Sequence, residues 1–371
     1  MKKILALLLT VVMVLSLVAC GSNAPAPSPE PSPQTPGDLA RPVEPEDEEV
    51  EVRRVAAIMN QVGVNPFLTQ VVDELAILAT EFPMEYTVIE APDIAAFGEN
   101  IRAAVEEGYD LIISIGFQGA DAIAEISQMF PDRASYVIVD TVADSPYVKS
   151  ITFEAAEAAY LIGIVAAMVS ADHGQPNGPF GAVHANPGQG SFHWRYGFMR
   201  GAMRINPELT TADFIFNYTT SFTDVALARE LALQQHAQGV LFVNGASAVA
   251  DFGTFDAALE QGFFTSGQDA DRTTPDNPNI LTTQLKYTGM ATRLAVEAFF
   301  SAEGIQPGVI RLGLPEGGVG ATHITSPGIF RNYEVLTDEI IEEARRAWQE
   351  ILDGTVTLLP VPMEEDFMAN N

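Results

Sequence analysis

The sequence predicts an α/β protein of two successive halves, each a mostly parallel sheet flanked by helices. From Arg53 onward, short apolar runs alternate with helical periods of ten to fifteen residues, a spacing typical of βαβ units. The alternation restarts after Tyr160. About 320 residues lie beyond the N-terminal region, enough for two domains.

The elements follow from hydrophobic periodicity, with apolar runs as strands and amphipathic runs as helices. In the first half, strands are predicted at residues 55–59, 84–90, 111–115 and 135–139, and helices at 69–80, 94–107 and 120–129. In the second half, strands are predicted at residues 179–184, 213–217, 239–243 and 263–266, and helices at 192–204, 224–237 and 254–260. A last helix is predicted at residues 338–352.

The first nineteen residues have the pattern of a secretory leader. Lys2 and Lys3 precede an almost unbroken apolar run over residues 4–18. At about fifteen residues, this run is shorter than the roughly 20 that a membrane-spanning helix needs. We therefore predict that residues 1–19 are a signal peptide.

The leader ends in Leu17-Val18-Ala19-Cys20-Gly21. This stretch resembles the lipobox of bacterial lipoproteins, in which the cysteine is diacylated and becomes the new N-terminus. An ordinary signal peptide that happens to contain a cysteine is the alternative, but Cys20 is the only cysteine of the chain, which also excludes an internal disulfide. Cys20 is thus the predicted lipidation site.

A proline-rich stretch follows. Residues 21–50 hold eight prolines among Ser, Ala, Glu and Asp, and before Val50 only Leu39 and Val43 are larger aliphatic residues. Such a segment cannot bury enough apolar surface to fold. Residues 20–50 are therefore predicted to be a lipid-anchored, disordered, acidic tether.

The composition excludes several function classes. The chain has 19 Lys and Arg against 49 Asp and Glu, a net charge of −30, which becomes −32 if Lys2 and Lys3 leave with the leader. Nucleic acid and anionic lipid surfaces are poor partners for it. No later stretch is expected to span the membrane, so the lipid is the expected anchor.

The chemical motifs of enzymes and cofactor proteins are not found in the sequence. It has no phosphate-binding G-x-x-x-x-G-K-[ST] loop, no G-x-S-x-G nucleophile elbow and no paired histidine spacing, so no enzyme, no cofactor and no metal site are expected. His193, beside Trp194, is a candidate polar neighbour of a ligand.

Unusual residues stand at predicted strand ends and loops, which in open α/β sheets meet the ligand. They are Asn60, Gly116-Phe117, Asp140, Trp194, Asp269 and Asp271.

Several motifs along residues 53–330 occur in the order known from one protein family. They include the segments 110–117, 130–132, 136–140, 160–163, 194–201, 221–224, 267–271 and 316–320. Each is weak alone. As an ordered set, the chain resembles the basic membrane protein family of purine-nucleoside-binding lipoproteins, the substrate-binding components of ABC transporters.

The resemblance implies a type I periplasmic-binding fold, with two lobes that close on a small-molecule ligand. The N-terminal lobe would comprise residues 53–157 with about 285–310, and the C-terminal lobe residues 158–284 with part of 311–371. The implied partners are a purine nucleoside, an ABC permease and, through the lipid, the extracytoplasmic face of the cell membrane.

The resemblance also implies ligand-binding roles for individual residues. Phe67 and Trp194 match the two aromatic rings that clamp the base. Asp269 and Lys286 match the pair that holds the ribose hydroxyls. Asp140 matches the aspartate at the base edge, and Asn60 stands near an Asp-Asn pair of the family.

The chain departs from the family at two places. Gly63 to Gln70 keep the phenylalanine and glutamine of a family motif but lack its acidic pair. Asn244-Gly245-Ala246-Ser247 replaces a glycine-rich loop. Altered contacts with the base are therefore expected.

Structural roles remain open for the same residues. Phe67 can be a hydrophobic staple, and Trp194 can be a core residue at helical spacing, although the glycines around it favour an open loop. Asp140 and Asp269 can be helix N-caps or turn residues, as can Asp271. Lys286 can be a surface lysine on an edge strand.

Three functions are compatible with these features. The first is a substrate-binding lipoprotein of an ABC importer for a purine nucleoside. The second is a ligand sensor of the same fold, for a sugar or an autoinducer, that presents its closed form to a membrane receptor. The third is a secreted nucleoside hydrolase.

Overall fold

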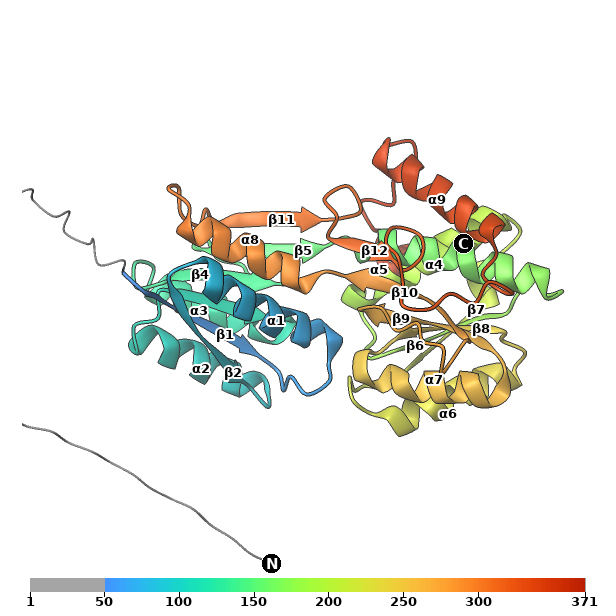
Figure 1. The fold of residues 1–371 in the computed structure, drawn as a ribbon, viewed down its shortest axis with the longest axis horizontal. Coiled ribbons are helices and arrows are strands. Elements are labelled where there is room, and N and C mark those ends of the chain that lie inside the picture. Colours follow the sequence, from blue (N-terminus) through green and yellow to red (C-terminus); the bar gives the residue numbers. More distant parts are fainter. Residues whose placement is uncertain (1–50, 371) are drawn as a thin grey trace, which may run out of the picture. The chain divides into compact units, whose positions relative to one another are not determined.

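The computed structural model describes residues 51–370 (Figure 1). The predicted signal peptide, the lipidation site Cys20 and the tether lie outside these residues.

The first sheet of the described chain has six strands in the order β11-β5-β4-β3-β1-β2, and all neighbouring strands pair in parallel. These are β1 (Arg53–Met59), β2 (Met84–Glu90), β3 (Leu111–Ile115), β4 (Ser135–Val139), β5 (Val148–Phe153) and β11 (Gly308–Leu312). All five residues of β3, with the sequence LIISI, are buried. Such continuous apolar runs are expected where helices cover both faces of a parallel sheet.

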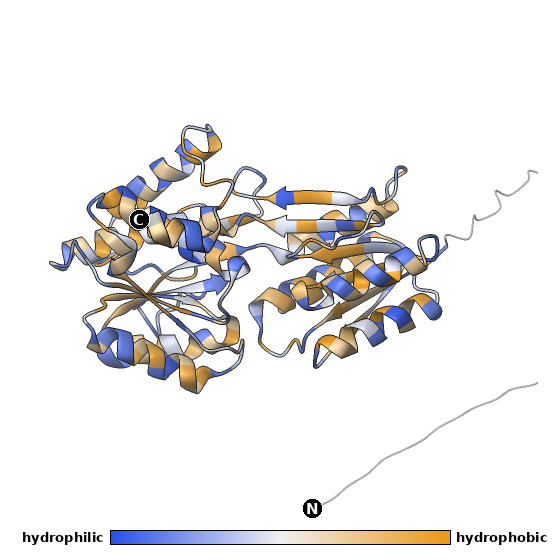
Figure 2. Ribbon diagram, turned by 180° about the vertical axis from the view of Figure 1, so that it is seen from behind, coloured by the Kyte–Doolittle hydropathy of each residue, from blue (hydrophilic) through white to orange (hydrophobic). Residues whose placement is uncertain are grey.

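Helices α1 (Pro66–Glu81) and α8 (Thr288–Phe300) cover one face of this sheet, and α2 (Ile94–Glu106) and α3 (Ala120–Met129) cover the other (Figure 1). Alternate residues of β1 divide between the faces. Val55 and Ala57 belong to the buried cluster that includes α1, whereas Ala56 and Ile58 belong to the cluster with α2 and α3. Figure 2 shows the apolar colouring concentrated in the strands and the polar colouring on the outer helix surfaces.

The second sheet of the described chain also has six strands, in the order β12-β10-β9-β8-β6-β7. They are β6 (Phe180–His184), β7 (Phe214–Tyr218), β8 (Phe242–Ala246), β9 (Phe264–Asp269), β10 (Ile280–Lys286) and the antiparallel β12 (Val319–Ala321). Helices α4 (Ala155–Asp172) and α5 (Gln189–Ile205) pack on one face, and α6 (Val225–Ala237) and α7 (Asp251–Gln261) on the other. Near the C-terminus, α9 (Asp338–Leu352) packs against α4, and α10 (Glu364–Asn370) follows.

Within residues 51–370 the chain passes between the two sheets three times: from β5 through α4 to β6, from β10 through α8 to β11, and from β11 to β12. The two halves are therefore successive only up to β10, after which α8 and β11 return to the first sheet. The prediction of an α/β fold with two mostly parallel sheets is confirmed.

Two expectations about elements are wrong. The strand predicted at residues 239–243 is β8 (Phe242–Ala246), because Gly239 and Val240 still donate hydrogen bonds to the end of α6. The expectation that no later stretch is long and apolar enough to span a membrane fails for α4, which has 18 residues and a mean hydropathy of 1.5. In the structure, 83% of α4 is buried inside the fold.

Glycines bring α4 and α5 into close contact. A Cβ atom on Gly163 of α4 would lie 2.1 Å from the carbonyl oxygen of Phe198. On α5, a Cβ atom on Gly197 would lie 2.1 Å from the carbonyl oxygen of Ala156, and one on Gly201 would lie 2.0 Å from that of Tyr160. Because the obstacles are backbone atoms, a larger residue would force the helices apart.

We therefore expect Gly197→Ala to lower the free energy of unfolding by about 1–3 kcal/mol, the usual range for overpacking. Gly190→Ala is the matched control, since it lies on the same helix with no heavy atom within 4 Å of its added Cβ. Urea unfolding followed by circular dichroism measures both. Equal stability of the two variants would contradict the packing assigned to α5.

Candidate functional site

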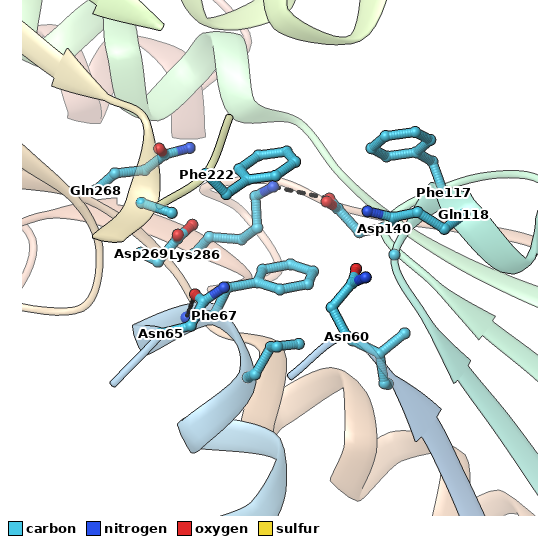
Figure 3. A pocket seen from close by; sticks show the side chains of 14 residues that line it. Asn60, Asn65, Phe67, Phe117, Gln118, Asp140, Phe222, Gln268, Asp269 and Lys286 are labelled. Carbon is cyan, nitrogen blue, oxygen red and sulfur yellow. Dashed lines mark hydrogen bonds and ion pairs between the residues drawn. The ribbon is translucent and has the colours of Figure 1, made fainter. Parts of the chain in front are cut away.

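A pocket lies where the carboxyl ends of the strands of the two sheets face each other (Figure 3). The residues that line it from the first-sheet side are Asn60, Asn65, Phe67, Leu68, Ile115, Gly116, Phe117, Gln118 and Asp140. Those from the second-sheet side are Phe222, Ala248, Gln268, Asp269 and Lys286.

Lys286 is the central charged residue of the pocket. It ends β10, an interior strand between β9 and β12, and only 6% of it is exposed. Its Nζ donates to Asp140 Oδ1 of the first-sheet side over 2.8 Å (Figure 3). The interpretation of Lys286 as a surface lysine on an edge strand is therefore wrong.

Aromatic rings surround the same ammonium group. Nζ of Lys286 lies 5.3 Å from the ring centroid of Phe67, 5.6 Å from that of Phe153 and 5.2 Å from that of Trp194. These distances are within the range of cation–π attraction. The rings and Asp140 together compensate for the loss of water around a buried cation.

Asp140 and Asp269 occupy equivalent places, at the carboxyl ends of β4 and β9. Their φ angles are +72° and +69°, in the left-handed region that residues other than glycine rarely adopt. A bend follows Asp140, and Asp269 is the last residue of its strand, so neither is a helix N-cap. Strained residues of this kind are concentrated at ligand sites, where the surrounding structure holds them in place.

Asp269 is buried with part of its hydrogen-bonding capacity unused. It is 3% exposed, and its Oδ1 has no hydrogen-bond partner among the described residues. The pKa of its carboxyl group is raised to about 6, mainly by burial and also by the nearby Asp140, although Lys286 and Arg272 act in the opposite direction. A buried acceptor of this kind favours a ligand that brings hydrogen-bond donors.

Phe67 and Phe222 supply aromatic surface from the two sides of the pocket. Phe67 is the second residue of α1, after the N-cap Asn65 and Pro66, so the interpretation as a staple before the helix is wrong. Phe222 stands in the loop between β7 and α6 and is 38% exposed. Figure 3 shows the two rings on either side of the Lys286 side chain.

Trp194 lies inside α5, which contains the helix predicted at residues 192–204, and not in the open loop that its neighbouring glycines favoured. It is 5% exposed and belongs to the main buried cluster, as the interpretation as a core residue expects. It is not among the residues that line the pocket, and its contact with the site is the one between its ring and the ammonium group of Lys286. The expected open loop is wrong because α5 starts at Gln189, and its Gly197 is needed for packing against α4.

The remaining candidates divide between the pocket and its surroundings. Asn60 lines the pocket, and its Nδ2 donates to the carbonyl oxygen of Ala91 over 3.4 Å. Asp271 holds a turn, because its Oδ1 accepts from both the backbone N–H and the hydroxyl of Thr273. His193 lies outside the pocket lining, and burial, with Arg311 and Lys286 nearby, lowers its pKa.

Sequence reasoning assigned no role to several pocket residues. Phe222 was noted only as part of a motif, and Asn65, Gln118, Ala248 and Gln268 were not singled out. What they share is their position at the carboxyl ends of strands, since Gln118 and Phe222 follow β3 and β7, and Gln268 is the second-last residue of β9. The general rule that ligands meet strand carboxyl ends would have found them.

The arrangement suits a small ligand with an aromatic ring and several hydroxyl groups. Exposed aromatic rings can stack on a planar group. The two carboxylates can accept hydrogen bonds from hydroxyl groups, and the ammonium group can donate to their oxygens. In the part of the chain that the structure describes, no group of three or more His, Cys, Asp or Glu residues is placed to hold a metal ion.

Solved structures share this fold. A solute-binding protein of an ABC transporter system from Aeropyrum pernix has a TM-score of 0.72, with 22% sequence identity, over 85% of this chain and 96% of that one. A transcriptional activator of the comK gene from Bacillus halodurans has a TM-score of 0.66, with 20% identity, over 82% of this chain and 99% of that one. At these identities the likeness shows the fold, which is that of type I periplasmic-binding proteins.

Curated relatives are similar in sequence. Basic membrane protein B of Borrelia garinii is 27% identical over 245 residues, which is 64% of this chain and 68% of that protein. Basic membrane protein A of Borreliella afzelii is 26% identical over 287 residues, which is 75% of this chain and 82% of that protein.

A family model settles the assignment, because it matches residues 65–359, which include every pocket residue except Asn60. The chain belongs to the Bmp family of PnrA-like ABC transporter substrate-binding proteins.

Proposed function

We propose that this protein is a lipid-anchored, extracytoplasmic receptor that captures a purine nucleoside in the pocket between its two sheets and delivers it to an ABC permease. The observation that carries the ligand class is the combination of Phe67 and Phe222 with Asp140, Asp269 and Lys286 around one pocket. Membership of the family supports the role in transport.

The base would stack on the aromatic side chains. Phe67 enters from α1 and Phe222 from the loop after β7, so a planar ring between them would contact both halves of the protein. Trp194, which the resemblance pairs with Phe67, would contact the ammonium group of Lys286 and not the base. Stacking of aromatic rings contributes about 0.5–1.5 kcal/mol beyond the area it buries.

The ribose would bind at the charged group. Asp269 offers an unpartnered oxygen, and Lys286 a donor that is now shared with Asp140. Hydroxyl groups between them would donate to the carboxylates and accept from the ammonium. A neutral nucleoside fits a pocket with two carboxylates and one ammonium, whereas the phosphate of a nucleotide would be repelled.

Base selectivity would come from the amides around the first-sheet rim. Asn60, Asn65 and Gln118 line the pocket from that side, and the segment Gly63 to Gln70 lacks the acidic pair of the family motif that it resembles. An amide offers both donors and an acceptor, so this rim can bind a purine edge with either pattern. The contacts with the base would therefore differ from those of relatives with acidic side chains.

The ligand class is tested by a thermal-shift panel of purine nucleosides, pyrimidine nucleosides, free bases, sugars and nucleotides. A purine nucleoside at 100 times its dissociation constant should add about 2.7 kcal/mol to the stability of the folded state and raise its melting temperature. Stabilisation by a sugar or an autoinducer, with none by any purine nucleoside, would favour the sensor function instead. Release of free base from inosine would favour the hydrolase.

We expect affinity for inosine to fall as the pH decreases through about 6. The hydroxyl donors of the ligand favour the ionised form of Asp269, whose pKa in the free protein is about 6. Binding is then strongest above that pH and weakens by up to about tenfold per pH unit below it. Isothermal titration between pH 5 and 7.5 measures this dependence.

In Asp269→Asn the affinity should be at least about tenfold lower at pH 7.5 and nearly independent of pH, because the amide does not ionise in this range. Asp121→Asn, which changes an exposed carboxylate in the first turn of α3, should keep the wild-type profile. A wild-type affinity that stays constant over this range would rule out Asp269 as the acceptor.

The anchor is tested by metabolic labelling with a fatty acid in the producing bacterium. Label should appear in the wild type and be absent from Cys20→Ala, because the chain has no other cysteine. Two acyl chains hold a protein stably on a membrane where one binds only marginally. The wild type should therefore sediment with membranes, and label in Cys20→Ala would disprove the assignment.

A further inference from the structure

Gln70 joins the two sides of the pocket through a single amide group. It lies in the second turn of α1, and its Nε2, which carries two hydrogens, is within hydrogen-bond distance of three carbonyl oxygens, so that two of them share one hydrogen. One, that of Pro66, belongs to its own helix at 3.0 Å. The other two are those of Lys286 at 3.1 Å and Asp269 at 3.3 Å, both from the second sheet.

The chemistry of these partners fixes the orientation of the amide. Carbonyl oxygens only accept hydrogen bonds, so the NH2 end of Gln70, and not its oxygen, must face them. Asp269 and Lys286 end the neighbouring parallel strands β9 and β10, in which Asp269 pairs with Leu285. One amide can therefore reach both strand ends at once.

The two backbones that Gln70 holds carry the charged groups of the pocket. Asp269 is in the left-handed region at φ +69°, a conformation that persists only where its surroundings maintain it. The side chain of Lys286 spans the pocket to Asp140. Loss of the bond to the Asp269 carbonyl removes one of the restraints that aim its carboxylate into the pocket.

A second hydrogen bond also joins α1 to the chain after β10, but it does not involve Gln70. The hydroxyl of Thr288 donates to the carbonyl oxygen of Phe67 over 2.7 Å. It fixes the start of α1 against the crossing segment after β10, without touching the carbonyls of Asp269 or Lys286. The side-chain hydrogen bonds from α1 to the backbone carbonyls of the two charged residues therefore come from Gln70, whereas Phe67 of α1 meets only the ammonium group of Lys286.

We propose that Gln70 is a positioning residue that couples the approach of the two sides of the pocket to the placement of Asp269 and Lys286. When the start of α1 packs on the ends of β9 and β10, the Gln70 amide fixes the backbones of Asp269 and Lys286. The carboxylate and the ammonium group are then both held in the pocket. The effect on ligand affinity rests on the proposed function, whereas the ordering of the two strand ends does not.

The test compares Gln70→Met with Gln128→Met in the full chain. Methionine has a similar length and helix propensity but lacks the amide. Gln128 is a matched control, since it is also a helical glutamine on the first-sheet side that bonds a carbonyl four residues back, that of Ala124 at 3.0 Å. Its other bond, to the Asp144 carbonyl, stays on that side.

For inosine, Gln70→Met should bind about tenfold more weakly, and Gln128→Met should bind like the wild type. In the double variant Gln70→Met with Asp269→Asn, the combined loss of affinity should be smaller than the product of the two single losses, because part of the effect of Gln70 acts through Asp269. A purely structural role would make the two losses multiply. Gln70→Glu is a second variant, and its carboxylate cannot donate to the carbonyls at neutral pH.

Hydrogen–deuterium exchange without ligand separates this proposal from the proposed function. Peptides covering residues 264–272 and 280–288 should exchange faster in Gln70→Met and unchanged in Gln128→Met. If no nucleoside binds but this difference is present, the proposed function fails and the role of Gln70 stands. Unchanged exchange, unchanged inosine affinity or multiplicative losses would each overturn the role of Gln70.

Discussion

The pocket depends on the burial of one ammonium group, that of Lys286. A buried cation is stable only with compensation, and here the partners come from both sides of the pocket: the carboxylate of Asp140, 2.8 Å away, and the rings of Phe67 and Trp194. Asp269 is close enough for Lys286 to oppose the rise in its pKa. Asp140, Phe67 and Asp269 also line the pocket, so these groups around the ammonium are ones that a ligand would meet.

The fold creates this arrangement by directing strand carboxyl ends of two sheets towards one place. Asp140 and Asp269 are at equivalent ends, and both have the left-handed backbone that is unfavourable for a residue with a side chain. Such a conformation is kept where packing and hydrogen bonds determine it. The tight contact of α4 with α5 fixes these two helices against each other, because a side chain at its glycines would collide with backbone atoms.

Part of the site was predictable residue by residue, because position at a strand end is a local feature: Asn60, Asp140 and Asp269 stand there and line the pocket. Phe67 and Lys286 also line it, but only the resemblance to the family implied them. Trp194 was harder, since its neighbouring glycines suggest a loop, yet Gly197 serves the contact of two helices. Phe222 was passed over because a phenylalanine in a polar loop has no periodicity that reveals what it faces.

The sequence by itself determined the α/β class and most strands and helices of residues 53–266, since these follow from apolar periodicity over short windows. It did not reveal α4, because a helix that is apolar on nearly every side has no amphipathic pattern. Only the tertiary structure decided that α8 and β11 return to the first sheet, and that Gln70 meets Asp269 and Lys286. Those partners lie 199 and 216 residues away along the chain, and their proximity is a property of packing between sheets.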